Sequence, residues 1–251
     1  MVGDTLSIAT SLLPAGKPLL PQAPVQTNHN NLHRKKASDR QAYPHVDIPT
    51  LLKTIDLLIV NKPAGIPVHG NYSIAMLLSD AWAQVLPDMP PAVGSANNSP
   101  QSLSFKPGPL HRLDKDTTGI LCFSRTLAGA QWFSQCLREK TVGKYYLGIV
   151  RGTMQTQRIT ADDESGKTIT QCYSIEYNKA IDASLMLFKL ITGKKHQIRK
   201  HTASVGHPLI GDRKYMGGNP LPGCTQYQLH AWKLYFPASR PMDIPAFIEA
   251  P

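Results

Sequence analysis

Short apolar runs of strand length recur through the sequence from residue 55 onward. They lie at residues 55–60, 120–123, 145–150, 168–177, 184–191 and 227–236. Apolar residues at helical spacing predict helices at residues 74–85 and 127–137, and a short third helix is expected at 196–205. Strands and helices therefore do not alternate regularly, as they would around a parallel sheet. This order favours an α+β fold with a mixed, largely antiparallel central sheet flanked by helices.

Polar residues and glycines mark the ends of several expected elements. Ser73 and Thr126 can cap the first two helices, and Gly206 marks the C-terminal end of the third. The fourth and fifth apolar runs are expected to form a hairpin around Asn178–Asp182. Thr117-Thr118-Gly119 predicts a turn into the strand that follows it. The run at 227–236 is expected to be the last strand.

Two segments lack sustained periodicity. Residues 1–49 contain a polar and basic stretch at 28–36, and we interpret them as a flexible basic arm in front of one catalytic domain at residues 50–251. Residues 87–109 contain six prolines and lead directly to His111. So long a segment without periodicity is a candidate for a mobile flap over a functional site.

The charge balance of the chain points to a polyanionic partner. The chain has 251 residues, with 27 Lys and Arg against 17 Asp and Glu, a formal net charge of +10. Its most basic folded part, Lys189–Lys214, contains a single acid, Asp212. A strongly basic chain most often binds nucleic acid, and this segment is expected to hold phosphates. A basic protein without such a partner remains the alternative.

The spacing of potential metal ligands is unfavourable for a metal site. The four cysteines form no C-x-x-C pair, and His196, His201 and His207 are spaced so that they do not share one helix face. We therefore expect no metal site. No apolar run approaches the length of a membrane span, and no signal peptide is visible. We expect a reduced, cytoplasmic protein that does not bind membranes.

A short charged segment is the strongest candidate for a reactive site. Residues 110–119 read Leu-His-Arg-Leu-Asp-Lys-Asp-Thr-Thr-Gly and lie between a proline-rich loop and an apolar strand. A carboxylate beside cations, on a loop that a rigid strand holds in place, is a common way to build a reactive site. On its own, the segment could equally be a solvated surface turn.

Several segments in a fixed order resemble the RluA family of pseudouridine synthases. They are Val60–Gly65, His111–Asp114 with the Thr-Gly turn that follows, Lys144–Tyr146, Thr192–Arg199 and Gly206–Asp212. The resemblance covers about residues 55–236. It implies a pseudouridine synthase fold with a catalytic cleft across the sheet. It also implies isomerisation of specific uridines in structured RNA, ribosomal (23S) or transfer RNA, with no cofactor.

The resemblance implies catalytic roles for three residues. Asp114 matches the family's catalytic aspartate, which acts as nucleophile or base. Arg199 matches the arginine that pairs with this aspartate, a role that suits its planar fork and permanent charge. Tyr146 matches a tyrosine on which a flipped uracil can stack. Strand alternation predicts that its neighbour Tyr145 points to the opposite face.

Further residues are expected to bind RNA, and the protein is expected to act as a monomer. By resemblance, Arg112 helps to displace the target base. The RNA-binding candidates are Arg112, His111, Lys194, Lys195, His196, Lys200 and Lys62. The chain departs from the family pattern at Lys194-Lys195, where arginine and a small hydroxyl residue are more usual, and the connection from Gly152 to Gly166 is short.

Two other functions remain open from the residues alone. An RNA-binding module without catalysis would need the basic charge but not Asp114. A glycoside hydrolase could use Asp114 and Asp116 as its carboxylate pair. Two residues on one short loop rarely reach the separation that such a pair needs, and a basic surface does not suit a neutral sugar.

Overall fold

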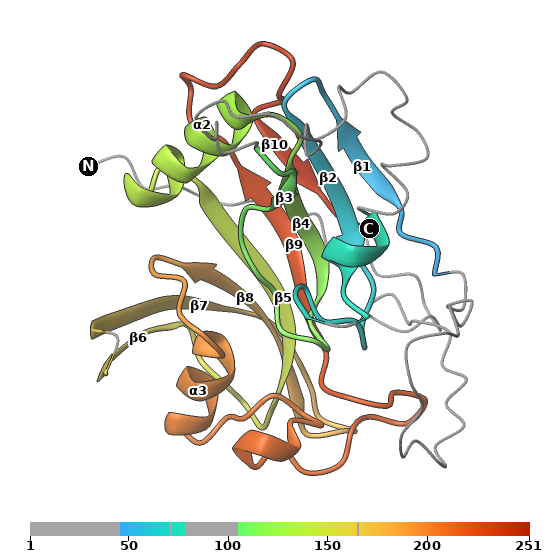
Figure 1. Ribbon diagram of the computed structural model, residues 1–251. Helices are drawn as coiled ribbons and strands as arrows, with labels where there is room; N and C mark the ends of the chain where they lie inside the picture. The colour runs from blue at the N-terminus through green and yellow to red at the C-terminus, as the bar shows by residue number, and fades with distance from the viewer. Residues whose placement is uncertain (1–45, 71, 79–104, 165) are drawn as a thin grey trace, which may run out of the picture.

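The computed structural model describes residues 46–70, 72–78, 105–164 and 166–251, which build a 10-stranded sheet with helices against it (Figure 1). The strands are β1 (Thr50–Lys53), β2 (Leu57–Lys62), β3 (Gly108–Pro109), β4 (Thr118–Ser124), β5 (Gly143–Arg151), β6 (Gln157–Asp163), β7 (Gly166–Asn178), β8 (Ala183–Leu190), β9 (Leu229–Tyr235) and β10 (Phe247–Glu249). The helices are α2 (Leu127–Arg138), α3 (Gln197–Ser204) and the short 3-10 helix η2 (Arg213–Tyr215).

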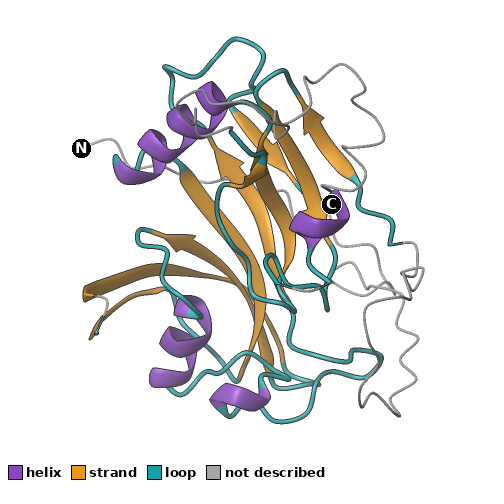
Figure 2. Ribbon diagram, in the orientation of Figure 1, coloured by secondary structure: helices purple, strands orange, loops and turns teal. Residues whose placement is uncertain are grey.

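The strand order across the sheet is β1-β2-β4-β9-β5-β8-β7-β6, with β3 paired to β4 and β10 paired to β9. β4 and β9 run parallel, and all other pairs among the described strands are antiparallel. α2 packs against β4, and α3 packs against β7 and β6. The two helices lie toward the upper and lower ends of the view in Figure 2. The predicted α+β class with a mixed, largely antiparallel sheet is confirmed.

β2 and β4 are buried on both faces, which explains their continuous apolar sequences. Ile59 and Ile120 pack with Phe133 of α2 on one face of the sheet. Val60 and Leu121 belong to the larger cluster on the other face. Because side chains alternate along a strand, a strand covered on both sides needs apolar residues at successive positions. The two strands therefore form a rigid base for the loop that precedes β4.

Gly119 allows β4 and β9 to approach each other closely. The sequence predicts a turn at residues 117–119, but Thr118 and Gly119 lie within β4. Gly119 has φ +103°, and a Cβ there would lie 2.3 Å from the carbonyl oxygen of Ala231 in β9. Any larger residue at this position would separate the parallel pair just after the charged loop.

The predicted helix ends are largely as the structure has them. Thr126 Oγ1 accepts a hydrogen bond of 3.1 Å from the backbone N–H of Gly129 at the start of α2. α3 follows His196, which has a left-handed backbone (φ 56°), and Gly206 with φ +82° lies just past its end. Residues 74–78 are helical after Ser73, and the remainder of the helix expected to residue 85 lies outside the described residues.

Several strands differ from the prediction. The strand expected at 55–60 is β2, displaced by two residues, and Ile55 is 77% exposed between β1 and β2. The sequence does not predict β1, β3, β6 or β10. Since β10 follows β9, the run at 227–236 is not the last strand. The hairpin around Asn178–Asp182 is confirmed as β7 and β8. Residues 1–45 of the expected arm and 87–104 of the expected flap lie outside the described residues.

Candidate active site

Asp114 lies on the loop at residues 110–117, between β3 and β4, which we call the Asp114 loop. The backbone N–H of Thr117 donates to the carbonyl oxygen of Asp114 at 3.1 Å and closes a turn within the loop. The Asp114 side chain keeps 17% of its surface exposed, at the edge of a cavity. The rigid β4 that follows fixes where this carboxylate lies.

Lys62 of β2 holds the Asp114 loop from beneath. Its Nζ donates to the carbonyl oxygens of Pro63 (2.8 Å), Lys115 (2.8 Å) and Thr117 (2.9 Å), and the residue is fully buried. Burial lowers the pKa of Lys62 to about 7, against the opposing effect of Asp116 and Asp114. This geometry does not support the expectation that Lys62 binds RNA, because all three of its donor hydrogens face backbone carbonyls.

Arg199 of α3 links two carboxylates. Its Nε and Nη2 donate to Oδ2 and Oδ1 of Asp212 at 2.6 and 2.9 Å, and its Nη1 lies 3.4 Å from Oδ2 of Asp114. Its guanidinium also lies over the rings of Tyr227 and Tyr215, at 4.5 and 5.1 Å from their centroids. The structure thus brings Arg199 and Asp114 together, and the closer, bidentate contact of the arginine is with Asp212.

Asp212 was given no role by the sequence arguments. It is 1% exposed and lies just before η2, where its Oδ1 also accepts from the backbone N–H of Lys214 at 3.2 Å. Burial acts to lower the pKa of Arg199, but the hydrogen bond with Asp212 and the nearby carboxylate of Asp114 raise it overall. One signal was available in the sequence, since Asp212 is the single acid in the basic segment 189–214.

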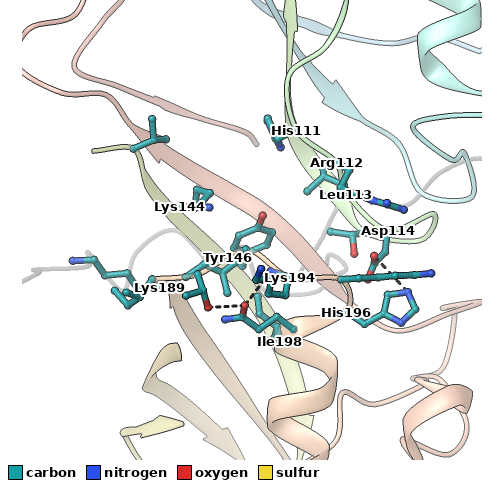
Figure 3. A pocket seen from close by; sticks show the side chains of 18 of the residues that line it. His111, Arg112, Leu113, Asp114, Lys144, Tyr146, Lys189, Lys194, His196 and Ile198 are labelled. Atoms are coloured by element: carbon teal, nitrogen blue, oxygen red, sulfur yellow. Dashed lines mark hydrogen bonds and ion pairs between the residues drawn. The ribbon is translucent and has the colours of Figure 1, made fainter. Parts of the chain in front are cut away.

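His196, which precedes α3, lies next to Asp114. Its Nε2 lies 3.6 Å from Oδ1 of Asp114, and its Nδ1 lies 2.9 Å from the hydroxyl of Tyr215. Burial lowers the pKa of His196, while the charge of Asp114 acts in the opposite direction. Figure 3 shows His196 and Asp114 next to each other at one end of the cavity.

Tyr146 lies in the wall of the cavity, on the strand β5. Burial and the charge of Asp114 raise the pKa of Tyr146, so its phenol is protonated at neutral pH. Tyr145 packs instead edge-on against Tyr235, with ring centroids 5.4 Å apart. The two neighbouring tyrosines therefore lie on opposite faces of the sheet, as the strand alternation predicts.

The cavity has a volume of about 660 Å³ and is rich in cations (Figure 3). Its basic lining residues are Arg112, Lys140, Lys144, Lys167, Lys189, Lys194, Lys195 and Arg199, with the histidines His111 and His196. His111 accepts a 3.1 Å hydrogen bond from the backbone N–H of Cys122 through Nε2, and burial lowers its pKa to about 4. Lys200 is exposed on α3 and does not line the cavity.

A family model described as RNA pseudouridylate synthase matches residues 56–204 of the chain. The chain belongs to this family. The match spans the Asp114 loop, β5 and α3, which carry the site described above. It confirms the resemblance stated from the motifs.

Individual members of the pseudouridylate synthase family support the assignment. The chain is 33% identical over 203 residues to ribosomal large subunit pseudouridine synthase C of Pasteurella multocida, covering 72% of this chain and 57% of that protein. It is 30% identical over 233 residues to ribosomal large subunit pseudouridine synthase D of Nitrosomonas europaea, covering 83% and 61%. The chain thus spans about three fifths of the length of these relatives.

Among solved structures, human RNA pseudouridylate synthase domain containing 4 shares the fold. The TM-score is 0.58 at 22% identity, and the match covers 81% of this chain and 88% of that one. Human RNA pseudouridylate synthase domain containing 1 matches with a TM-score of 0.57 at 24% identity, over 78% and 82%.

The histidines of this pseudouridylate synthase family member lie apart. His201 contacts Thr168 and His207 contacts the backbone of Arg151, whereas His196 faces Asp114. Within the described ranges, no three His, Cys, Asp or Glu side chains converge as metal ligands.

The helices in the described part of the chain are too short or too polar to cross a bilayer.

Proposed function

We propose that this chain is an RNA pseudouridine synthase that isomerises specific uridines in structured RNA, with Asp114 as its catalytic carboxylate. One observation carries the proposal. A partly buried carboxylate contacts a fixed arginine at the edge of a basic cavity that is also lined by an aromatic side chain, Tyr146. A flipped base needs such a pocket, with a surface to stack on and groups that act on its sugar bond.

The reaction balances without a second substrate. The N1–C1′ bond of uridine breaks, the uracil turns, and C5 bonds to C1′; the proton on C5 is released and N1 takes up a proton. Asp114 acts at the sugar or the ring as nucleophile or base. Arg199, which Asp212 holds on the other side, keeps this carboxylate in one orientation.

The names of the relatives and the positive charge of the cavity rim support the choice of substrate. Both relatives described above have the ribosomal large subunit in their names, so large-subunit rRNA is the first substrate to test and transfer RNA the second. The exposed Lys194 and Lys195 at the rim are proposed to hold phosphates. Arg112, which is exposed on the Asp114 loop, is proposed to displace the target base.

The function is tested by release of tritium from RNA that carries [5-³H]uridine, because isomerisation exchanges the C5 hydrogen with water. Large-subunit rRNA and transfer RNA from cells that lack this protein are the two substrates. Release from either RNA, with pseudouridine at a defined position, is the expected result. Protein that binds these RNAs but releases no tritium from them would instead favour an RNA-binding module.

RNA binding is expected to weaken steeply with salt. If about four of the cavity lysines contact phosphates, counterion release predicts a loss of affinity of roughly 50- to 150-fold between about 50 and 200 mM salt. Filter binding with a catalytically inactive variant measures this without turnover. A change of less than about threefold would contradict a binding surface dominated by phosphate contacts.

A further inference from the structure

Lys144 is a half-buried cation of the cavity, and burial lowers the pKa of its ammonium. It lies on β5 two residues before Tyr146, so both side chains point to the same face and into the same cavity (Figure 3). In the part of the chain that the structure describes, its ammonium makes no ion pair and no hydrogen bond. Lys62, by contrast, donates to three carbonyls. A desolvated cation without a carboxylate partner suits an anionic ligand.

Burial makes the environment of Lys144 unfavourable for its charge. Burial lowers the pKa of Lys144, and no neighbouring carboxylate opposes the shift. The same ammonium contributes to the lowered pKa of His111, which also lines the cavity. Such a position costs stability, so it is the kind of residue that a protein retains for function.

The ammonium of Lys144 lies where a side chain at position 193 would crowd it, and Gly193 has none. A Cβ at Gly193 would lie 2.9 Å from Nζ of Lys144. This stretch of the wall is fixed, because Oε1 of Gln197 accepts from Thr192 Oγ1 at 2.8 Å and from the backbone N–H of Lys194 at 3.1 Å. The ammonium therefore lies against a rigid glycine-containing loop beside the space for a flipped base.

We propose that Lys144 is a catalytic residue whose ammonium stabilises the negative charge that the uracil ring acquires when its N1–C1′ bond breaks. The inference rests on the proposed function. When that bond breaks, its electron pair leaves with the ring and is spread over N1, O2 and O4, while Asp114 offsets the electron deficiency at C1′. Lys144 keeps its proton throughout. The ring charge is lost again when C5 bonds to C1′.

The position of Lys144 favours the uracil over an RNA phosphate as its ligand. Lys194 and Lys195 are exposed at the rim, where a backbone phosphate can approach them, whereas Lys144 is half-buried on the same strand face as Tyr146. A fixed cation in a site that excludes water acts most strongly on charge that develops in the transition state.

The test separates the rate of isomerisation from RNA affinity. Lys144→Gln is expected to lower the single-turnover rate at saturating RNA by about 100- to 1000-fold. Its RNA dissociation constant should change by less than about threefold, and its salt dependence should be unchanged. Lys195→Gln is the matched comparison and should weaken RNA binding instead. Lys53→Gln, exposed on β1, controls for the loss of one positive charge.

Gly193→Ala provides a second test that leaves every charge in place. The added methyl group displaces the flexible end of Lys144, so the rate should fall at least about tenfold with the fold and RNA affinity retained. The double variant should be no slower than Lys144→Gln alone, because both changes act on one ammonium. If Lys144→Gln fails to fold, the isomerisation rate of Gly193→Ala alone tests the role of Lys144.

Two outcomes would overturn the role of Lys144. The first is a Lys144→Gln protein that isomerises within about twofold of the wild-type rate. The second is a variant that loses RNA affinity and about one unit of salt slope with no loss of rate at saturation, which would make Lys144 a phosphate ligand. Failure of the proposed function is a separate result, since there the wild-type protein itself releases no tritium.

Discussion

Asp114→Asn is expected to abolish uridine isomerisation while RNA binding is retained or slightly tightened. The amide is nearly the same size as the carboxylate, so the Asp114 loop and its contacts with Lys62 should survive. The neutral amide cannot act as nucleophile or base, and the expected loss in rate is on the order of 10⁴-fold or more. Removing one negative charge from a surface that faces phosphates does not weaken binding. Tritium release and filter binding on the same preparations measure the two properties.

Asp116→Asn is the matched control for this variant. Asp116 lies on the same loop two residues further on, and it makes no contact with Arg199 or His196. Its variant should keep its activity within about tenfold, because it removes the same charge from nearly the same place. A folded Asp114→Asn protein that turns over normally would exclude Asp114 as the catalytic carboxylate. Equal losses in both variants would revive a mechanism that uses the two carboxylates as a pair.

The sequence predicted the central strands well and the peripheral ones poorly. β2 and β4 are buried on both faces, so they carry continuous apolar runs that stand out in the sequence. β6 carries several polar and charged residues and lies at the edge of the sheet, and β10 has three residues. Edge strands face solvent on one side, and their sequences are accordingly closer to those of loops.

The site shows a similar division between local and long-range information. Strand alternation on β5 was sufficient to predict that Tyr146 and Tyr145 point to opposite faces. The bidentate contact of Arg199 with Asp212 was not predictable, because it depends on how α3 and η2 pack against each other. The family motif supplied the pairing of Arg199 with Asp114. It did not supply the second carboxylate that holds the arginine in place.

Lys62 is the residue whose surroundings differ most from those that the sequence suggests. A lysine next to a proline-glycine turn in a basic chain is most simply interpreted as a surface cation that binds RNA. The structure instead buries it completely beneath the Asp114 loop. The carbonyls that it binds come from residues 53 and 55 positions away in the chain, as well as from its neighbour Pro63. The local sequence does not predict these partners, because every residue has a backbone carbonyl and none is marked as the acceptor.

Lys62→Met is therefore expected to destabilise the protein and to disturb the Asp114 loop, rather than to weaken RNA binding directly. The variant leaves three carbonyl oxygens without their donor, and the expected loss is about 3–5 kcal/mol in the free energy of unfolding. Urea denaturation measures this loss, and tritium release from the fraction that remains folded should also fall, because Asp114 is no longer held in place. Lys53→Met, an exposed lysine on β1, should change stability by no more than about 0.5 kcal/mol. A Lys62→Met protein of wild-type stability with reduced RNA affinity would restore Lys62 as an RNA ligand and contradict its role beneath the loop.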